Sequence, residues 1–168
     1  MQRMMSAAQE NRSPALILVP TRELAVQVEE EACKLGKYTG IRTASFYGGV
    51  GYQNQEDALK NGVDLLIGTP GRIIDLLERK IMNLSTIGFL VVDEADRMFD
   101  MGFYPDLRSL LSAIPKAEDR QTMLFSATLS TWVKNLAWEY TVDAKEITID
   151  ADSVTVDEIS QKLFHVAA

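Results

Sequence analysis

Five short apolar runs, separated by longer stretches with helical spacing, constrain the fold of this chain more than any other feature. Several runs are continuous rather than alternating, which is typical of strands covered on both faces. Strand–helix alternation predicts an α/β fold, with a mostly parallel sheet, right-handed crossovers and helices on both faces. The expected strands are Ala15–Val19, Arg42–Tyr47, Asp64–Ile67, Phe89–Val92 and Thr122–Phe125, with Ile147–Ile149 as a plausible sixth.

Apolar residues between these runs recur at the three- to four-residue spacing of amphipathic helices. Cys33 falls within the first such pattern, so we expect it in the core rather than as a nucleophile. The sets are Leu24, Val28, Ala32 and Leu35; Ile73, Ile74, Leu76 and Leu77; Leu107, Leu110, Leu111 and Ile114; and Val133, Leu136, Ala137 and Tyr140.

The chain has 168 residues and a formal net charge of −7. The length suits one domain, and the charge argues against a basic surface that grips nucleic acid without regard to sequence. Binding through backbone amides and helix N-termini, which needs few lysines, stays open. No apolar stretch approaches a membrane span, so we expect no membrane partner. The single cysteine suits a reducing cytoplasm, or the nucleus if the protein is eukaryotic.

An acidic tetrapeptide, Asp93-Glu94-Ala95-Asp96, follows the apolar run Phe89–Val92. A buried strand that ends in acidic residues delivers carboxylates to the rim of a parallel sheet, where α/β folds bind ligands. One carboxylate there can hold Mg²⁺, usually through its waters, and its neighbour can orient or deprotonate an attacking water. An ordinary acidic turn is an equally good interpretation of these four residues taken alone.

Three other expected strands end in turns that suit a phosphate backbone: Pro20-Thr21-Arg22-Glu23, Tyr47-Gly48-Gly49 and Thr69-Pro70-Gly71-Arg72. A threonine N-cap followed by proline begins a helix with free amides and a positive dipole end. Glycines let a ligand backbone approach closely. Each turn alone is better explained as a helix start or a simple turn. All three at one edge of the sheet favour a groove for a phosphodiester chain.

The fifth expected strand ends in Ser126-Ala127-Thr128. Its two hydroxyls could hydrogen-bond a carboxylate at the neighbouring strand end, Asp96 in particular. Thr128 could instead serve as the N-cap of the following helix, and the spacing does not choose between the two.

Taken together and in this order, the five motifs resemble those of the DEAD-box RNA helicases. The sequences are Pro20–Ala25, Gly48-Gly49, Thr69–Arg72, Asp93–Asp96 and Ser126–Thr128, and the resemblance covers the chain from about Pro14 to Val166. Five motifs in order are far more specific than any one of them. The resemblance implies a three-layer RecA-like domain, the first of the two in the helicase core.

The resemblance also implies roles for the residues that match the motifs. Asp93 and Glu94 would serve ATP, with Asp93 holding Mg²⁺ through water and Glu94 acting on the hydrolytic water. Asp96 would couple to Ser126 and Thr128 and so link nucleotide state to strand separation. RNA would be held along its sugar–phosphate backbone by Pro20, Thr21, Arg22, Gly48, Gly49, Thr69, Gly71 and Arg72.

In one respect the chain departs from the family pattern. The sequence has no phosphate-binding loop of the form G-x-x-x-x-G-K-[ST], which should precede the first strand. We therefore expect a fragment that lacks the P-loop strand and the second RecA-like domain, binds no ATP or Mg²⁺ tightly, and is inactive alone. The expected boundaries are a residual helix or disordered leader over 1–12, the partial domain over 13–150, and a linker with the start of a further strand over 151–168.

The missing strand should leave an unpaired edge or slot in the sheet, and unpaired edges recruit other strands. The apolar tail Lys162–Val166 is a candidate partner, within one chain or in an edge-paired or strand-swapped dimer. Two other functional classes stay open. One is a related DNA translocase, and the other is a non-catalytic module that binds RNA or protein.

Overall fold

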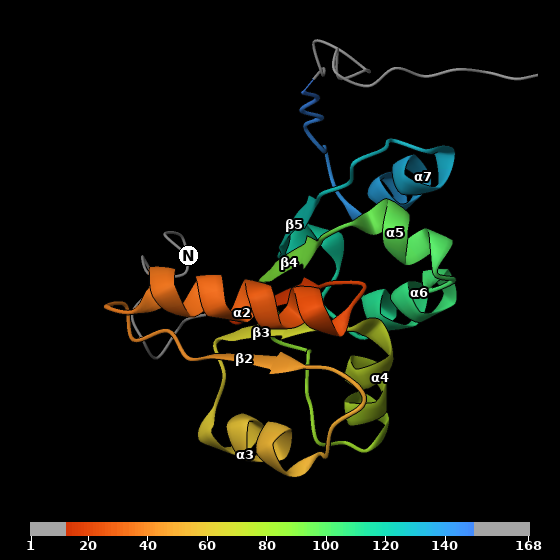
Figure 1. Ribbon diagram of the computed structural model, residues 1–168. Helices are drawn as coiled ribbons and strands as arrows, with labels where there is room; N and C mark the ends of the chain where they lie inside the picture. The colour runs from red at the N-terminus through yellow and green to blue at the C-terminus, as the bar shows by residue number, and fades with distance from the viewer. Residues whose placement is uncertain (1–12, 150–168) are drawn as a thin grey trace, which may run out of the picture.

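The computed structural model describes residues 13–149 and contains one sheet of five parallel strands (Figure 1). The strand order is β2-β3-β1-β4-β5, so the chain runs from the central strand β1 to the edge strand β2, returns to β3, and then crosses β1 to reach β4 and β5. The strands are β1 (Ala15–Leu18), β2 (Thr43–Phe46), β3 (Leu65–Gly68), β4 (Phe89–Val92) and β5 (Gln121–Leu124). All five strands predicted from apolar runs are confirmed, with ends that differ by at most one residue.

Within residues 13–149, six α-helices and one short 3₁₀ turn connect or follow the strands. The helices are α2 (Arg22–Gly36), α3 (Gln53–Asn61), α4 (Pro70–Glu78), α5 (Ala95–Asp100), α6 (Tyr104–Ser112) and α7 (Thr131–Tyr140), and the turn is η2 (Ala117–Asp119). The four amphipathic patterns correspond to α2, α4, α6 and α7. Helices α3 and α5 lack such a pattern, because α3 is almost wholly polar and α5 is only six residues long.

The two faces of the sheet carry different cores. On one face, Leu16, Leu18 and Leu90 pack with residues of α4, α6 and α7, and half-buried residues around α3 join this core. On the other, Ala15 and Leu65 pack against Ala25 and Ala32 of α2. The face that each helix covers follows from the right-handedness of the connections. The step from β1 to β2 runs across the sheet in the opposite direction to the steps from β3 to β4 and from β4 to β5, so their helices lie on opposite faces. The RecA-like three-layer arrangement predicted from the sequence is confirmed (Figure 1).

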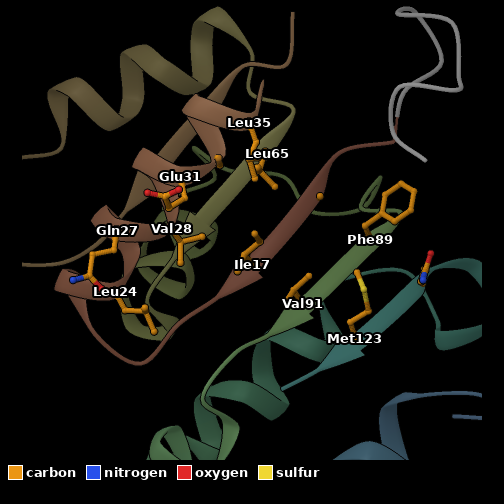
Figure 2. Close-up of a pocket in the computed structure, with 13 residues that line it drawn as sticks. Ile17, Leu24, Gln27, Val28, Glu31, Leu35, Leu65, Phe89, Val91 and Met123 are labelled. Atoms are coloured by element: carbon orange, nitrogen blue, oxygen red, sulfur yellow. The ribbon is translucent and has the colours of Figure 1, made fainter. Parts of the chain in front are cut away.

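Helix α2 packs on β2 and β3, and a broad apolar hollow opens on the same face beside it. Figure 2 shows Ile17, Val91 and Met123 of three adjacent strands pointing into this hollow, with Leu24 and Val28 of α2 on its other side. Its volume is about 680 Å³. Parallel sheets are usually covered on both faces. Here no helix within residues 13–149 covers β4 and β5 on the α2 side.

Two predictions about single segments are wrong. Cys33 is exposed rather than in the core, because it lies one position, about 100° around the helix, beyond the buried Ala32. Residues Ile147–Ile149 form no strand, and the exposed fractions of Ile147 and Ile149 are 78% and 92%. No described strand pairs with this segment, so its apolar side chains have nothing to pack against.

The sheet ends at β5, which pairs with β4 and with no other described strand. The predicted gap is therefore an edge, because the five strands lie side by side without an internal slot. The tail Lys162–Val166 and the leader 1–12 lie outside the described residues. Within the part of the chain that the structure describes, no helix is long and apolar enough to cross a membrane.

Candidate functional site

The five motifs end five neighbouring strands and so meet at one edge of the sheet. Across this rim, in strand order, lie Gly48–Gly49, Thr69–Arg72, Pro20–Arg22, Asp93–Asp96 and Ser126–Thr128. The carboxyl ends of parallel strands are where α/β folds bind ligands. The three turns that suit a phosphate backbone follow β2, β3 and β1, whereas the motifs with acidic and hydroxyl side chains follow β4 and β5.

Thr21 and Arg22 begin helix α2 at the centre of the rim. The hydroxyl of Thr21 caps the helix by accepting a hydrogen bond from the Leu24 amide at 3.3 Å. The guanidinium of the exposed Arg22 lies 5.1 Å from the centre of the Tyr47 ring. No carboxylate of the described residues is within ion-pair distance of it. Arg22 is thus an exposed cation beside the first helix N-terminus.

The glycine-rich loop after β2, residues 48–51, is next to Arg22. A Cβ atom added to Gly49 would lie 3.7 Å from Nη1 of Arg22. Gly49 has a φ of 81°, in the left-handed region that side chains rarely adopt. Gly48 and Gly49 are both exposed, so their backbone is accessible to a ligand at the rim.

Thr69 and Pro70 begin α4 as the sequence predicts, with Thr69 as the N-cap and Pro70 at the first helical position. The hydroxyl of Thr69 makes no capping hydrogen bond, so it is not committed to the helix. Gly71 is exposed in the first turn. Arg72 differs from Arg22, because it is buried, with 6% of its side chain exposed.

Asp93 and Glu94 form the turn between β4 and α5. The half-buried carboxylate of Asp93 accepts a hydrogen bond from the Glu94 amide at 3.0 Å. Glu94 adopts a left-handed conformation, with φ 48° and ψ 50°, and its carboxylate pairs with Arg97 at 3.0 Å. A non-glycine residue in this region carries backbone strain, and such strain collects at functional sites.

Asp96 connects the acidic turn to the end of β5. One of its carboxylate oxygens accepts hydrogen bonds from both the amide and the hydroxyl of Thr128, each at 2.9 Å. The hydroxyl of Ser126 donates to the Thr128 carbonyl at 2.7 Å, which tightens the same turn. The sequence was compatible with two roles for Thr128, a hydrogen bond with Asp96 or the N-cap of the following helix. The structure shows the contact with Asp96, whereas Ser130 is the N-cap of α7.

Opposing effects act on the pKa of the Asp96 carboxyl. Partial burial raises this pKa, but hydrogen bonds from Thr128, Arg97 and Ser126 outweigh burial and hold it below its usual value. Asp96 is therefore a carboxylate at neutral pH, and it can accept from both donors of Thr128 at once.

The donor set at the end of β4 fits Mg²⁺ bound through water. Carboxylate oxygens suit this ion, which keeps several waters and relies on substrate phosphates rather than on a protein cage. Among residues 13–149, no three His, Cys, Asp or Glu side chains gather closely enough to form such a cage. Asp93 is the residue that would hold the hydrated ion, with Glu94 beside it.

Sequence reasoning missed two residues that shape the rim, Gln55 and Tyr52. Gln55 donates to the Tyr47 carbonyl at 3.2 Å and accepts from Arg72 at 3.1 Å. The guanidinium groups of Arg72 and Arg79 lie 4.4 and 4.1 Å from the centre of the Tyr52 ring. The only sequence feature near these residues is the dipeptide Gly51-Tyr52 before a polar helix. That feature does not indicate that Gln55 is buried against Arg72.

Comparison with known proteins agrees with the geometry of the rim. The family model described as DEAD/DEAH box helicase matches residues 1–136. The chain is 50% identical over 151 residues to a protein of Pasteurella multocida (strain Pm70) named ATP-dependent RNA helicase RhlB, and the match covers 90% of this chain and 36% of that protein. A protein with the same name from Shewanella amazonensis is 44% identical, with 92% and 35% covered.

Solved structures show the same fold. The crystal structure of the yeast DEAD-box splicing factor Prp28 matches with a TM-score of 0.72 and 35% identity, over 77% of this chain and 31% of that one. A hypothetical ATP-dependent RNA helicase from Sulfolobus tokodaii also gives a TM-score of 0.72, with 33% identity over 78% and 39% of the two chains.

The fold and the motifs define a RecA-like helicase domain. The chain belongs to the DEAD/DEAH box helicase family. It spans about 36% of the length of the curated relatives that it matches.

Proposed function

We propose that this chain acts as part of an ATP-dependent RNA helicase, in which RNA-stimulated ATP hydrolysis drives the unwinding of RNA duplexes. The observation that carries the proposal is the continuous order of turns at the rim, from Gly48–Gly49 on β2 to Ser126–Thr128 on β5. The names of the bacterial relatives, ATP-dependent RNA helicases, support it. We place this activity in the cytoplasm.

RNA would lie across the ends of β2, β3 and β1, where exposed backbone and one exposed cation occur together. Pro20, Thr21, Arg22, Gly48, Gly49, Thr69, Gly71 and Arg72 are the residues of this region. The net charge of −7 is compatible with such a site, because helix N-termini and loop amides supply most of the donors. Contact with the backbone alone would leave recognition largely independent of base sequence.

The acidic half of the rim would serve ATP and Mg²⁺. When bound, Mg²⁺ would neutralise charge that develops on the phosphates, with Asp93 contacting it through water. Glu94 would orient the attacking water and accept its proton. Asp96, Ser126 and Thr128 would join this turn to β5, so that a change at the nucleotide could reach the neighbouring strand end.

We further propose that the chain alone hydrolyses no ATP and binds neither ATP nor Mg²⁺ tightly. The loop lysine and backbone amides that usually grip the triphosphate are not encoded in these 168 residues. A second RecA-like domain would complete the RNA site, and the edge of β5 is where another strand, including one from a second copy, could pair.

The deciding experiment is RNA-stimulated ATP hydrolysis and duplex unwinding by the chain joined to a P-loop segment and a second domain. Activity with RNA duplexes that disappears in Glu94→Gln would support the proposal. Equal unwinding of DNA would point to a translocase instead. ATP turnover by the 168-residue chain alone, lost in Glu94→Gln, would contradict the proposed dependence on added segments.

A further inference from the structure

Arg72 is the most completely engaged side chain at the rim. Its Nη1 donates to Oε1 of Gln55 at 3.1 Å, and its Nη2 donates to the Val50 carbonyl at 2.9 Å. Its Nε lies 3.8 Å from a carboxylate oxygen of Asp75, and its guanidinium lies 4.4 Å from the centre of the Tyr52 ring. With all three nitrogens facing protein and 6% of the side chain exposed, little of this cation is available to a ligand.

These contacts support the glycine-rich loop at two points. Arg72 holds the Val50 carbonyl directly, and through Gln55, which donates to the Tyr47 carbonyl at 3.2 Å, it also holds the start of the loop. Arg72 thereby connects the first turn of α4 to a loop that lies 22 residues earlier in the sequence.

The loop has little other support. It borders a hollow of about 480 Å³ that is lined by Tyr47, Val50, Gly51 and Gln55, among others. Its glycines have no side chains with which to pack, and glycine is the residue with the most backbone freedom to lose. Hydrogen bonds from Arg72 and Gln55, rather than apolar packing, are thus what holds the loop in one conformation.

We propose that Arg72 is a positioning residue. Its hydrogen bonds hold the loop 48–51 in one conformation, and it thereby controls RNA affinity without itself contacting a phosphate. Arg22 is the cation that would meet the phosphate, because it is exposed and adjacent to Gly49. This inference rests on the proposed RNA-binding function and assigns opposite tasks to two arginines in similar turns.

The salt dependence of RNA binding separates the two roles. A side chain that neutralises a phosphate releases a counterion, and its loss lowers the slope of log affinity against log salt by about 0.7 for single strands. A side chain that acts through the loop weakens binding at every salt concentration and leaves the slope unchanged.

The experiment measures binding of the 168-residue chain to a single-stranded RNA oligonucleotide over a series of salt concentrations. The variants are Arg72→Met, Arg72→Lys, Gln55→Leu and Arg22→Gln. We expect Arg72→Met and Gln55→Leu to weaken binding about tenfold with the wild-type slope, as loss of about 1.4 kcal/mol would. Arg72→Lys should not rescue, because a lysine lacks the planar fork that meets two acceptors. Arg22→Gln should lower the slope by about 0.7.

A lowered slope in Arg72→Met, or rescue by Arg72→Lys, would show a direct phosphate contact and overturn the inference. If Arg72→Met fails to fold, Gln55→Leu carries the test, since it removes one of the two supports, the link from Arg72 to the Tyr47 carbonyl, without removing a charge.

A second measurement, made without RNA, tests the positioning role of Arg72 independently of the proposed RNA-binding function. We expect the NMR order parameters of the exposed Gly49 and Gly51 amides to fall towards values typical of flexible backbone in Arg72→Met and in Gln55→Leu, but not in Arg22→Gln. Unchanged order parameters in the first two variants would refute the positioning role. If the variants show this pattern but the wild-type chain binds no RNA, the proposed function fails while the support of the loop by Arg72 stands.

Discussion

The two halves of the rim are organised by ions of opposite charge. On the side of β2, β3 and β1, the buried guanidinium of Arg72 gathers acceptors, the Val50 carbonyl and the amide oxygen of Gln55. On the side of β4 and β5, the carboxylate of Asp96 gathers donors, the amide and hydroxyl of Thr128. The cation is almost fully buried, whereas the carboxylate is half-exposed. The first half is therefore the costlier to break, and the second is the one that pH can change.

The largest effect should follow from Arg72→Met. We expect the free energy of unfolding to fall by about 2–4 kcal/mol, because the amide oxygen of Gln55 and the Val50 carbonyl lose their donor in a buried site. Urea denaturation would measure it. The matched control is Arg79→Met, which removes an exposed guanidinium from the same ring and the same carboxylate and should cost much less, since exposed ion pairs contribute little. Equal losses in the two variants would mean that burial does not distinguish them.

Asp96→Ala should have a smaller effect, about 1–2 kcal/mol, since its hydrogen bonds are partly accessible to water. A cycle with Thr128→Val, measured by urea denaturation, should show a coupling energy of about 0.5 kcal/mol or more. Asp100→Ala, an exposed acid on the same helix, serves as the control. Additive losses would indicate that Asp96 and Thr128 contribute independently.

The pH dependence should differ between the halves. Because its hydrogen bonds hold the pKa of Asp96 below its usual value, this carboxylate stabilises the fold above the unfolded-state pKa of about 3.9, and the contribution is lost as pH falls through the folded-state pKa. The stability difference between wild type and Asp96→Asn should thus shrink in acid. The difference for Arg72→Met should persist, since arginine stays charged there. Parallel profiles for both variants would contradict this.

The contrast also shows what a sequence can predict. Strand order along the chain and the position of each motif at a strand end follow from local patterns, and parallel pairing then brings the motifs together. The role of Arg72 could not be found in this way. Its acceptor Gln55 lies 17 residues away on a polar helix that has no apolar stripe to announce it. Nothing in the spacing distinguished a buried arginine from the exposed Arg22.

The other misses have the same origin in tertiary contacts. Cys33 follows the apolar stripe of α2 by one position, and only the packed helix shows which side of that boundary it takes. The run Ile147–Ile149 has strand-forming residues but no neighbouring strand among the described residues. Propensity alone does not make a strand, because the stabilising unit of a sheet is the pair.

The smallest predicted effects have opposite signs in the two halves. Gly49 and Glu94 both have positive φ, 81° and 48°. We expect Gly49→Ala to lower the free energy of unfolding by about 1 kcal/mol, because alanine is strained in this conformation. Glu94→Gly should raise it by about 0.5 kcal/mol by relieving that strain, less what the Arg97 ion pair contributes.

Thermal unfolding of both variants, beside Gly48→Ala as a control at a glycine without positive φ, would measure these changes. If Glu94→Gly is destabilising, the left-handed turn is not strained and its conformation needs another explanation. If it is stabilising, the acidic half carries a carboxylate in a conformation that the fold alone does not favour. Such a cost is expected of a residue kept for chemistry rather than for stability.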